Sequence, residues 1–207
     1  CMKTYDLIIV GAGIAGKATS LRLAQLGLKI LHLAPSFEVG FQGHDSAVWD
    51  SRIYALSASS KKLLEQMHVW SALDASRIQV VSDMRVFGDS GHADDEIHFS
   101  AFSATVPQLS WIVESGHIEK TLDAAIQFQG LIERITDKVI DVVSNNDSVT
   151  VTTESGLNVC GKLLLAADGA HSFVREKLQI ETTQNDYDQI GVVANFQAEK
   201  HLSLIHI

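Results

Sequence analysis

The chain has 207 residues, of which 46% are hydrophobic and 20% charged, and its formal net charge is −9 at pH 7. This composition is ordinary for a soluble globular protein, and the length allows one or two domains with a buried core. Because no block of lysine or arginine offsets the negative charge, nucleic-acid binding and anionic-membrane surfaces are disfavoured, and no apolar run approaches the ~18–20 residues that span a bilayer.

The ends and the cysteines of the chain bear on its origin. Cys1 and Cys160 form no Cys-x-x-Cys pair and no signal peptide precedes Tyr5, so a reducing, cytoplasmic compartment is the simplest interpretation. Met2 is a natural first residue for the protein, so we expect Cys1 to be a remnant from upstream of the natural start. Residues 202–207 resemble a translated sequencing adapter, so we expect a non-native tail there and a fragment of a longer protein before it.

The stretch Tyr5–Gly27 predicts a buried strand, a glycine-rich turn and a helix. Residues 7–10 form an apolar, β-rich run without alternation, which is typical of a central parallel strand. Gly27 stands where a left-handed cap would end the helix. The helix has one face of small and apolar residues at three- or four-residue spacing: Ile14, Ala18, Leu21 and Ala24.

Three glycines in the turn have separable roles. Gly11 allows a tight turn out of the strand. The missing Cβ at Gly13 lets the backbone approach a pyrophosphate, and at Gly16 it lets the helix and strand pack closely. The amides that open the helix then face an anion at the positive end of the helix dipole. The turn therefore predicts dinucleotide binding.

The second strand is expected at residues 28–33, before Pro35. In a dinucleotide-binding fold, an acidic residue near the end of this strand binds a ribose hydroxyl. Ala34 holds that place, and Glu38 follows too far along the loop to substitute without rearrangement. This departure weakens the predicted ribose contact and leaves the pyrophosphate argument unchanged.

A polar loop leads to Asp50 and Arg52, and a helix follows from about residue 59. Arg52 could contact an anionic cofactor, or it could be a surface arginine paired with Asp50, and spacing alone favours neither. Two β segments at 78–87 and 96–102 flank an acidic loop. The loop matches neither a calcium loop nor a paired-histidine zinc pattern, so we interpret it as a solvated hairpin.

The rest of the chain alternates between β and α patterns. These patterns predict a strand at 109–113, a helix at 116–128, a three-stranded meander between 138 and 160, a buried parallel strand at 162–167 and renewed β structure at 191–196.

Asp168 and Gly169 follow the predicted strand at 162–167 directly, at the edge where open α/β sheets bind ligands. Ser172 is expected to cap a short helix. His171 is interpreted as a turn-exposed histidine, because no hydrolase signature accompanies it. We therefore assign no catalytic acid, base or metal ligand.

Three segments in this order resemble the single-component FAD-dependent aromatic hydroxylases, most closely the ubiquinone-biosynthesis hydroxylases. They are the glycine turn at 11–16, the Asp-x-Arg…Ala-Leu-Ser element at 50–57 and the Asp-Gly…Ser-x-Val-Arg element at 168–175. The resemblance runs to about residue 201. It covers only the N-terminal half of such proteins, so much of the active-site roof and a second flavin element would lie outside this chain.

The resemblance implies an α/β fold. A Rossmann-like FAD-binding domain, with a parallel sheet and a β-meander, would occupy residues 1–78 and 111–182. The start of a β-rich substrate domain would occupy 79–110 and 183–201.

The cofactor-binding residues that the resemblance implies are Gly11, Gly13, Ile14, Ala15, Gly16, Arg52, Val139, Asp168 and Gly169. The turn would hold the FAD pyrophosphate, and Arg52 would contact the flavin side of FAD. The backbone of Val139 would meet the adenine, and Asp168 with Gly169 would lie near the pyrophosphate and ribityl chain. The chain departs from the family at Ala34, at Ala166 and at residues 115–116.

The implied activity is that of a monooxygenase that uses FAD, NAD(P)H and O₂ to hydroxylate a small aromatic substrate, a prenylated phenol or quinol of ubiquinone biosynthesis. A peripheral position at the inner membrane face or in a biosynthetic complex is expected, with no nucleic-acid partner. The fragment alone should be inactive. The alternatives are a flavoprotein reductase or dehydrogenase and, less favoured, a non-catalytic FAD-binding subunit.

Overall fold

The computed structural model describes residues 4–38, 49–88, 92, 95–193 and 204–206. The chain divides into two compact units, the first made of Cys1–Gly40 with Glu119–Ile190 and the second of Phe41–Ile118 with Gly191–Ile207. These boundaries differ from the predicted division into FAD-binding and substrate domains. Compactness alone does not decide which residues serve the cofactor, so that functional division stays a prediction.

The first unit contains one sheet and the helices that pack on it. Its elements are β1 (Thr4–Val10), α1 (Ile14–Gln25), β2 (Ile30–Ala34), β8 (Ile132–Thr136), β9 (Val139–Ser144), β10 (Val149–Thr153), β11 (Asn158–Ala166) and α4 (Phe173–Lys177). Helix α3 (Ser115–Gln127) contributes its residues from Glu119 onward to this unit.

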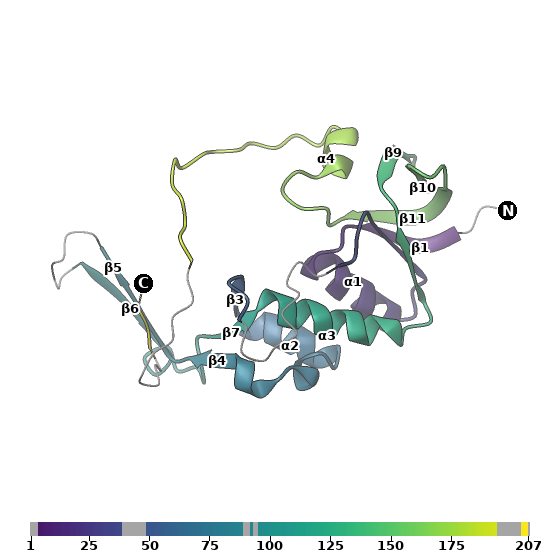
Figure 1. The fold of residues 1–207 in the computed structure, drawn as a ribbon. Coiled ribbons are helices and arrows are strands. Elements are labelled where there is room, and N and C mark those ends of the chain that lie inside the picture. Colours follow the sequence, from purple (N-terminus) through teal and green to yellow (C-terminus); the bar gives the residue numbers. More distant parts are fainter. Residues whose placement is uncertain (1–3, 39–48, 89–91, 93–94, 194–203, 207) are drawn as a thin grey trace. The chain divides into compact units, whose positions relative to one another are not determined.

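The six strands of this sheet lie in the order β8-β2-β1-β11-β10-β9, and Figure 1 labels β1, β11, β10 and β9 among them. The pairs β8–β2, β2–β1 and β1–β11 are parallel, whereas β10 pairs antiparallel with both β11 and β9. The predicted α/β architecture, a parallel sheet continued by a β-meander, is confirmed.

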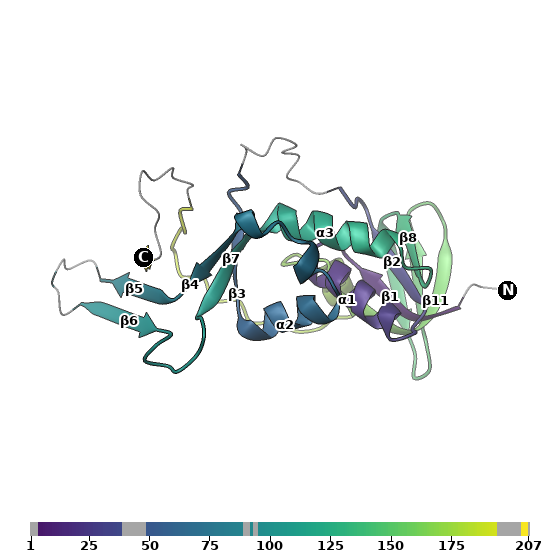
Figure 2. The same ribbon diagram turned by 90° about the horizontal axis from the view of Figure 1, so that it is seen from below.

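Strand β1 is buried on both faces of the sheet. Leu7 and Ile9 pack with Ala24 of α1, and Figure 2 shows α1 along this side of β1 and β2. Ile8 and Val10 belong to the opposite layer, with valines from β9, β10 and β11. A strand with two buried faces needs apolar residues at every position, which accounts for its unalternating sequence.

Strand β11 differs from the expectation in two ways. The segments expected at 157–160 and 162–167 are one strand, antiparallel to β10 in its first half and parallel to β1 along most of its length. The second half is not fully buried, because Leu163 is 63% exposed. Helix α1 packs over β1, β2 and β8. In the order of strands, β11 with Leu163 lies next to β1 on the side away from β2 and β8. The prediction of a buried strand here was therefore wrong.

Strand β8 had no counterpart in the predicted elements. Its sequence, Ile-Glu-Arg-Ile-Thr, has neither an apolar run nor an alternating pattern. It is fixed instead by parallel pairing with β2, from Ile30 opposite Ile132 to Ala34 opposite Thr136. This pairing depends on residues about 100 positions apart in the sequence.

The second unit carries two small sheets, with strand orders β3-β7-β4 and β12-β5-β6. Its elements are β3 (Ile53–Leu56), α2 (Ala58–Gln66), 3₁₀ turns at Trp70–Ala72 and Ala75–Arg77, β4 (Ile78–Val81), β5 (Asp83–Phe87), β6 (Glu96–Ser100), β7 (Ser110–Glu114) and β12 (Leu204–His206).

The β segment expected at 78–87 is two strands, β4 and β5, which belong to different sheets. The expected hairpin is present, because β5 and β6 pair antiparallel. Strand β12, inside the predicted non-native tail, pairs parallel with β5, and the origin of this tail stays a prediction. Residues 191–193 lie outside any strand, and residues 194–196 lie outside the described part of the chain.

Among the described residues, no helix combines the length and apolar character that crossing a bilayer would need.

The end of α1 has the predicted left-handed cap. Gly27 has φ +90°, its N–H donates to the Ala24 carbonyl at 2.9 Å, and the Leu28 N–H donates to the Leu23 carbonyl at 3.1 Å. These two bonds form a Schellman motif, which satisfies carbonyl groups at the end of the helix.

Replacement of Gly27 by alanine should lower the free energy of unfolding by about 1–2 kcal/mol, because an L-residue is strained at positive φ. No atom lies within 4 Å of the added methyl group, so the backbone alone supplies the cost. Urea unfolding of the purified protein measures it. Gly130→Ala is the matched control, since its Cβ also meets open space and its φ is not in the positive region. Equal stability of the two variants would contradict a strained, left-handed cap at Gly27.

Candidate functional site

The glycine turn after β1 is a close contact between backbone segments. Gly11 has φ +118°, and a Cβ on it would overlap the Ala167 carbonyl oxygen and lie 2.7 Å from the Asp168 nitrogen. The Gly11 N–H donates to the Leu33 carbonyl at 2.8 Å. Gly11 therefore serves both the predicted tight turn and a contact with the segment that carries Asp168.

Gly16 and Gly13 differ in what surrounds them. A Cβ on Gly16 would overlap the Gly11 carbonyl oxygen, so its role in close packing is confirmed, with the turn itself as the partner. Gly13 is the exposed N-cap residue of α1, and no atom lies within 4 Å of the position its Cβ would take.

The start of α1 has the properties of an anion site. Gly13 offers no side chain to cap the helix, and the first turn holds no acidic residue. The amides of Ile14 and Ala15 stand at the positive end of a twelve-residue helix, beside open space that a side chain at Gly13 would fill. These groups fit the pyrophosphate of a dinucleotide such as FAD.

A buried histidine lies beneath this turn, and the sequence did not lead us to it. His32 on β2 is completely buried, and its Nε2–H donates to the Gly11 carbonyl at 2.7 Å. The Ser20 hydroxyl, which donates to the Gly16 carbonyl at 2.8 Å, lies 3.0 Å from His32 Nδ1. Because a carbonyl only accepts, the neutral ring carries its proton on Nε2. A polar residue within an otherwise apolar strand was the signal available.

Burial lowers the pKa of His32 to about 4, although its hydrogen bond to Gly11 opposes this. The positive charges of Arg134 and Lys17 lower the pKa further, and the carboxylate of Asp123 acts in the opposite direction. The ring is therefore neutral near pH 7, and its one proton lies on Nε2, where it is donated to Gly11.

Lys17, the residue after Gly16, is a second buried group that the sequence analysis missed. Its ammonium group is completely buried and lies 3.1 Å from a Glu119 oxygen and 2.8 Å from an Asp123 oxygen. Arg134 on β8 reaches the other Asp123 oxygen at 2.6 Å. A buried ammonium needs such partners, so these ion pairs fix α3 against α1 at the turn.

The end of β2 lacks an acid, as the sequence indicates. Ala34 is completely buried, and its carbonyl accepts the Asp137 N–H at 2.9 Å. Glu38 is exposed, and its N–H donates to the Ser36 hydroxyl at 3.1 Å. A carboxylate therefore does not stand at the end of this strand.

Asp168 lies beside the glycine turn, but its carboxylate faces α4. Its two oxygens accept the Ser172 hydroxyl at 2.5 Å and the Val174 N–H at 3.1 Å. Ser172 in turn accepts the Arg175 N–H at 3.1 Å, so the predicted cap is confirmed. Gly169, with φ +91°, makes the sharp turn between them. The carboxylate thus holds the segment that contacts Gly11.

Val139 begins β9 opposite Thr153, and its side chain is buried in the core of the first unit. Only its backbone could serve a ligand, as the resemblance requires.

Arg52 belongs to the second unit and is exposed. Its guanidinium carbon lies 5.8 Å from the centre of the Tyr54 ring. The Asp50 carboxylate accepts the backbone N–H of Arg52 at 2.9 Å and that of Gly116 at 2.9 Å. The carboxylate of Asp50 therefore orders the backbone around Arg52 and the start of α3.

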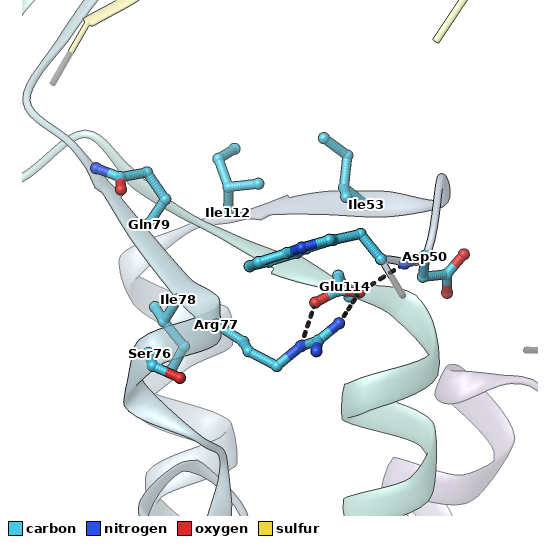
Figure 3. A pocket seen from close by; sticks show the side chains of 9 residues that line it. Asp50, Ile53, Ser76, Arg77, Ile78, Gln79, Ile112 and Glu114 are labelled. Atoms are coloured by element: carbon cyan, nitrogen blue, oxygen red, sulfur yellow. Dashed lines mark hydrogen bonds and ion pairs between the residues drawn. The ribbon is translucent and has the colours of Figure 1, made fainter. Parts of the chain in front are cut away.

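Next to this segment, the second unit has a hollow of about 230 Å³. Figure 3 shows Ile53 and Ile112 along one wall and the Arg77–Glu114 ion pair along another. Its lining residues are Trp49, Asp50, Ile53, Ser76, Arg77, Ile78, Gln79, Ile112 and Glu114.

Comparison with known proteins agrees with this geometry. A family model described as FAD binding domain matches residues 4–205. The chain is 26% identical over 197 residues to "Ubiquinone hydroxylase UbiM" of Neisseria meningitidis, covering 93% of this chain and 42% of that protein. It is 27% identical over 196 residues to "3-demethoxyubiquinol 3-hydroxylase" of Escherichia coli, with coverage of 94% and 49%. The chain thus spans about half or less of the length of these relatives.

Solved structures share the fold. p-Nitrophenol 4-monooxygenase PnpA from Pseudomonas putida aligns with a TM-score of 0.67 at 20% identity, covering 86% of this chain and 44% of that one. PqsL from P. aeruginosa, in complex with 2-aminobenzoylacetate, aligns with a TM-score of 0.69 at 17% identity, covering 89% and 48%.

The buried histidine predicts a pH dependence of stability. Unfolded, His32 takes up a proton below about pH 6.5, whereas folded it does so only near pH 4. The free energy of unfolding should therefore fall as pH drops from 6.5 to 4, by about 3 kcal/mol for this group. Urea unfolding across this range should show that His32→Gln removes this part of the slope. His171→Gln, at an exposed histidine, is the control. Parallel pH profiles for wild type and His32→Gln would exclude a neutral, buried ring.

Proposed function

The chain belongs to the FAD binding domain family, and from this membership we propose that the complete protein is an FAD-dependent monooxygenase that hydroxylates an aromatic ring. The observation that carries the proposal is the open glycine turn. Gly13 leaves space at the start of α1, and Gly11 brings the turn against Asp168. The relatives whose names describe ubiquinone hydroxylases support the same reaction class.

The residues of the first unit would bind the diphosphate part of the cofactor. The amides of Ile14 and Ala15 would donate to its oxygens, and the dipole of α1 would stabilise its charge. His32 would fix the Gly11 carbonyl, and thereby the orientation of the turn, through its 2.7 Å hydrogen bond. The backbone of Val139 would meet the adenine.

When bound, FAD supplies the redox chemistry of hydroxylation, and the protein supplies binding, orientation and electrostatics. Arg52 would contribute a positive charge to the flavin side of the cofactor. Asp168 would act through the backbone, because its carboxylate is engaged with Ser172 and Val174.

We further propose NAD(P)H as the reductant, O₂ as the co-substrate and a prenylated phenol or quinol as the ring that is hydroxylated. The names of the ubiquinone hydroxylases among the relatives support this substrate class. Cytoplasmic location, peripheral membrane contact and association with a biosynthetic complex belong to the same proposal, since such a substrate partitions into lipid.

Gly13→Val tests the site directly. The valine side chain would occupy the open space beside the amides of α1, so FAD binding by the complete protein should fall by at least about 100-fold. Gly130→Val adds the same side chain to another open position and should retain FAD. The flavin absorbance that remains after gel filtration measures both. Undiminished FAD in Gly13→Val would overturn the assignment of the turn.

Asp168→Ala should weaken FAD binding by about tenfold without unfolding the sheet, because the loss of two hydrogen bonds loosens the segment at Gly11. Ser172→Ala removes the cap of α4 and leaves the Asp168 carboxylate in place, so its effect on FAD should be smaller. Fluorescence titration with FAD gives the affinities, and circular dichroism checks the fold. Unchanged flavin retention in Asp168→Ala would count against a role for this residue.

A further inference from the structure

We propose that Arg77 and Glu114 are positioning residues that hold the backbone of Arg52 so that its guanidinium group can contact an anionic cofactor. This inference rests on the proposed function, in which Arg52 faces FAD. It assigns a role to an ion pair of the second unit that no sequence motif includes.

The ion pair between Arg77 and Glu114 has the geometry of a rigid clamp. Arg77 Nε and Nη2 donate to the two Glu114 oxygens at 2.7 Å each (Figure 3). Glu114, the last residue of β7, is only 3% exposed. Two parallel hydrogen bonds fix both position and orientation, which a single contact between point charges does not.

Burial alone would raise the pKa of Glu114, but hydrogen bonds from Arg77 and from the Asp50 amide hold it below its usual range. The same carboxylate raises the pKa of Arg77. Both groups therefore stay charged at neutral pH, as the clamp requires.

Glu114 also holds the segment that precedes Arg52. Its Oε2 accepts the backbone N–H of Asp50 at 2.6 Å, which Figure 3 shows beside the ion pair. The guanidinium carbon of Arg77 lies 4.4 Å from the centre of the Trp49 ring, so Arg77 contacts this segment as well. Arg77 therefore supports Trp49, and Glu114 supports Asp50.

The backbone of Arg52 is fixed on both sides by Asp50, which Glu114 holds, and by Ser115, which follows Glu114. Its N–H donates to the Asp50 carboxylate at 2.9 Å, and its carbonyl accepts the Ser115 N–H at 2.8 Å. Its side chain is exposed. A fixed backbone that carries an exposed cation reduces the entropy lost when the cation binds an anion. The strength of that contact should then depend on Arg77 and Glu114.

A double-mutant cycle in the complete protein tests this dependence. The variants are Arg52→Ala, Arg77→Gln and their combination, and the readout is the FAD dissociation constant from fluorescence titration. We expect each single change to weaken FAD binding by about tenfold. The double variant should bind no more weakly than Arg52→Ala, because Arg77 acts through Arg52.

Two further variants make the test specific. Arg85→Gln removes an arginine that pairs with Glu96 at 3.4 Å in the same unit, and it should leave FAD affinity unchanged. Arg77→Lys keeps the charge but loses the two-pronged geometry, so an intermediate affinity is expected, and it replaces Arg77→Gln in the cycle should that variant fail to fold.

The outcomes separate this inference from the proposed function. Additive losses in the double variant, or an unchanged FAD affinity in Arg77→Gln, would overturn the positioning role. If Arg52→Ala retains full affinity while Gly13→Val loses it, the Arg52 contact and its positioning pair are both overturned, but FAD binding at the glycine turn stands. Full retention in Gly13→Val would instead overturn the proposed site.

Discussion

The first unit depends on the close approach of three backbone segments around Gly11. A side chain at Gly11 would overlap the Ala167 carbonyl, and one at Gly16 would overlap the Gly11 carbonyl. His32 donates to that same carbonyl from below. Because the strand, the helix and the Asp168 segment can meet only where side chains are missing, the amides of α1 come to stand at one edge of the sheet. The candidate cofactor site is a consequence of this packing.

Much of this arrangement could be predicted because it depends on local residue types. A glycine is needed wherever φ is positive or backbones touch, so the roles of Gly11, Gly16 and Gly27 follow from their positions. The unalternating run of β1 follows from burial on both faces, and the Ser172 cap follows from the chemistry of a helix start. Family membership and the α/β fold were predicted for the same reason.

The rest depends on pairs of residues that the sequence separates widely. Lys17 is tolerable in a core only because Glu119 and Asp123 come from another helix, and Glu114 at the end of β7 pairs with Arg77 from the 3₁₀ turn at Ala75–Arg77. Local patterns carry no information on such partners. Asp168 shows a different limit: its place at the edge of the sheet was predicted, but its carboxylate accepts hydrogen bonds from Ser172 and Val174, four and six residues further on. The cofactor roles of Arg52 and Val139 stay predictions.

A crystal structure of the complete protein with FAD would locate the diphosphate. We expect diphosphate oxygens within about 3 Å of the amides of Ile14 and Ala15, beside Gly13. His32 Nε2 should still lie within hydrogen-bond distance of the Gly11 carbonyl. A diphosphate bound away from the start of α1, with another group beside Gly13, would exclude the proposed site.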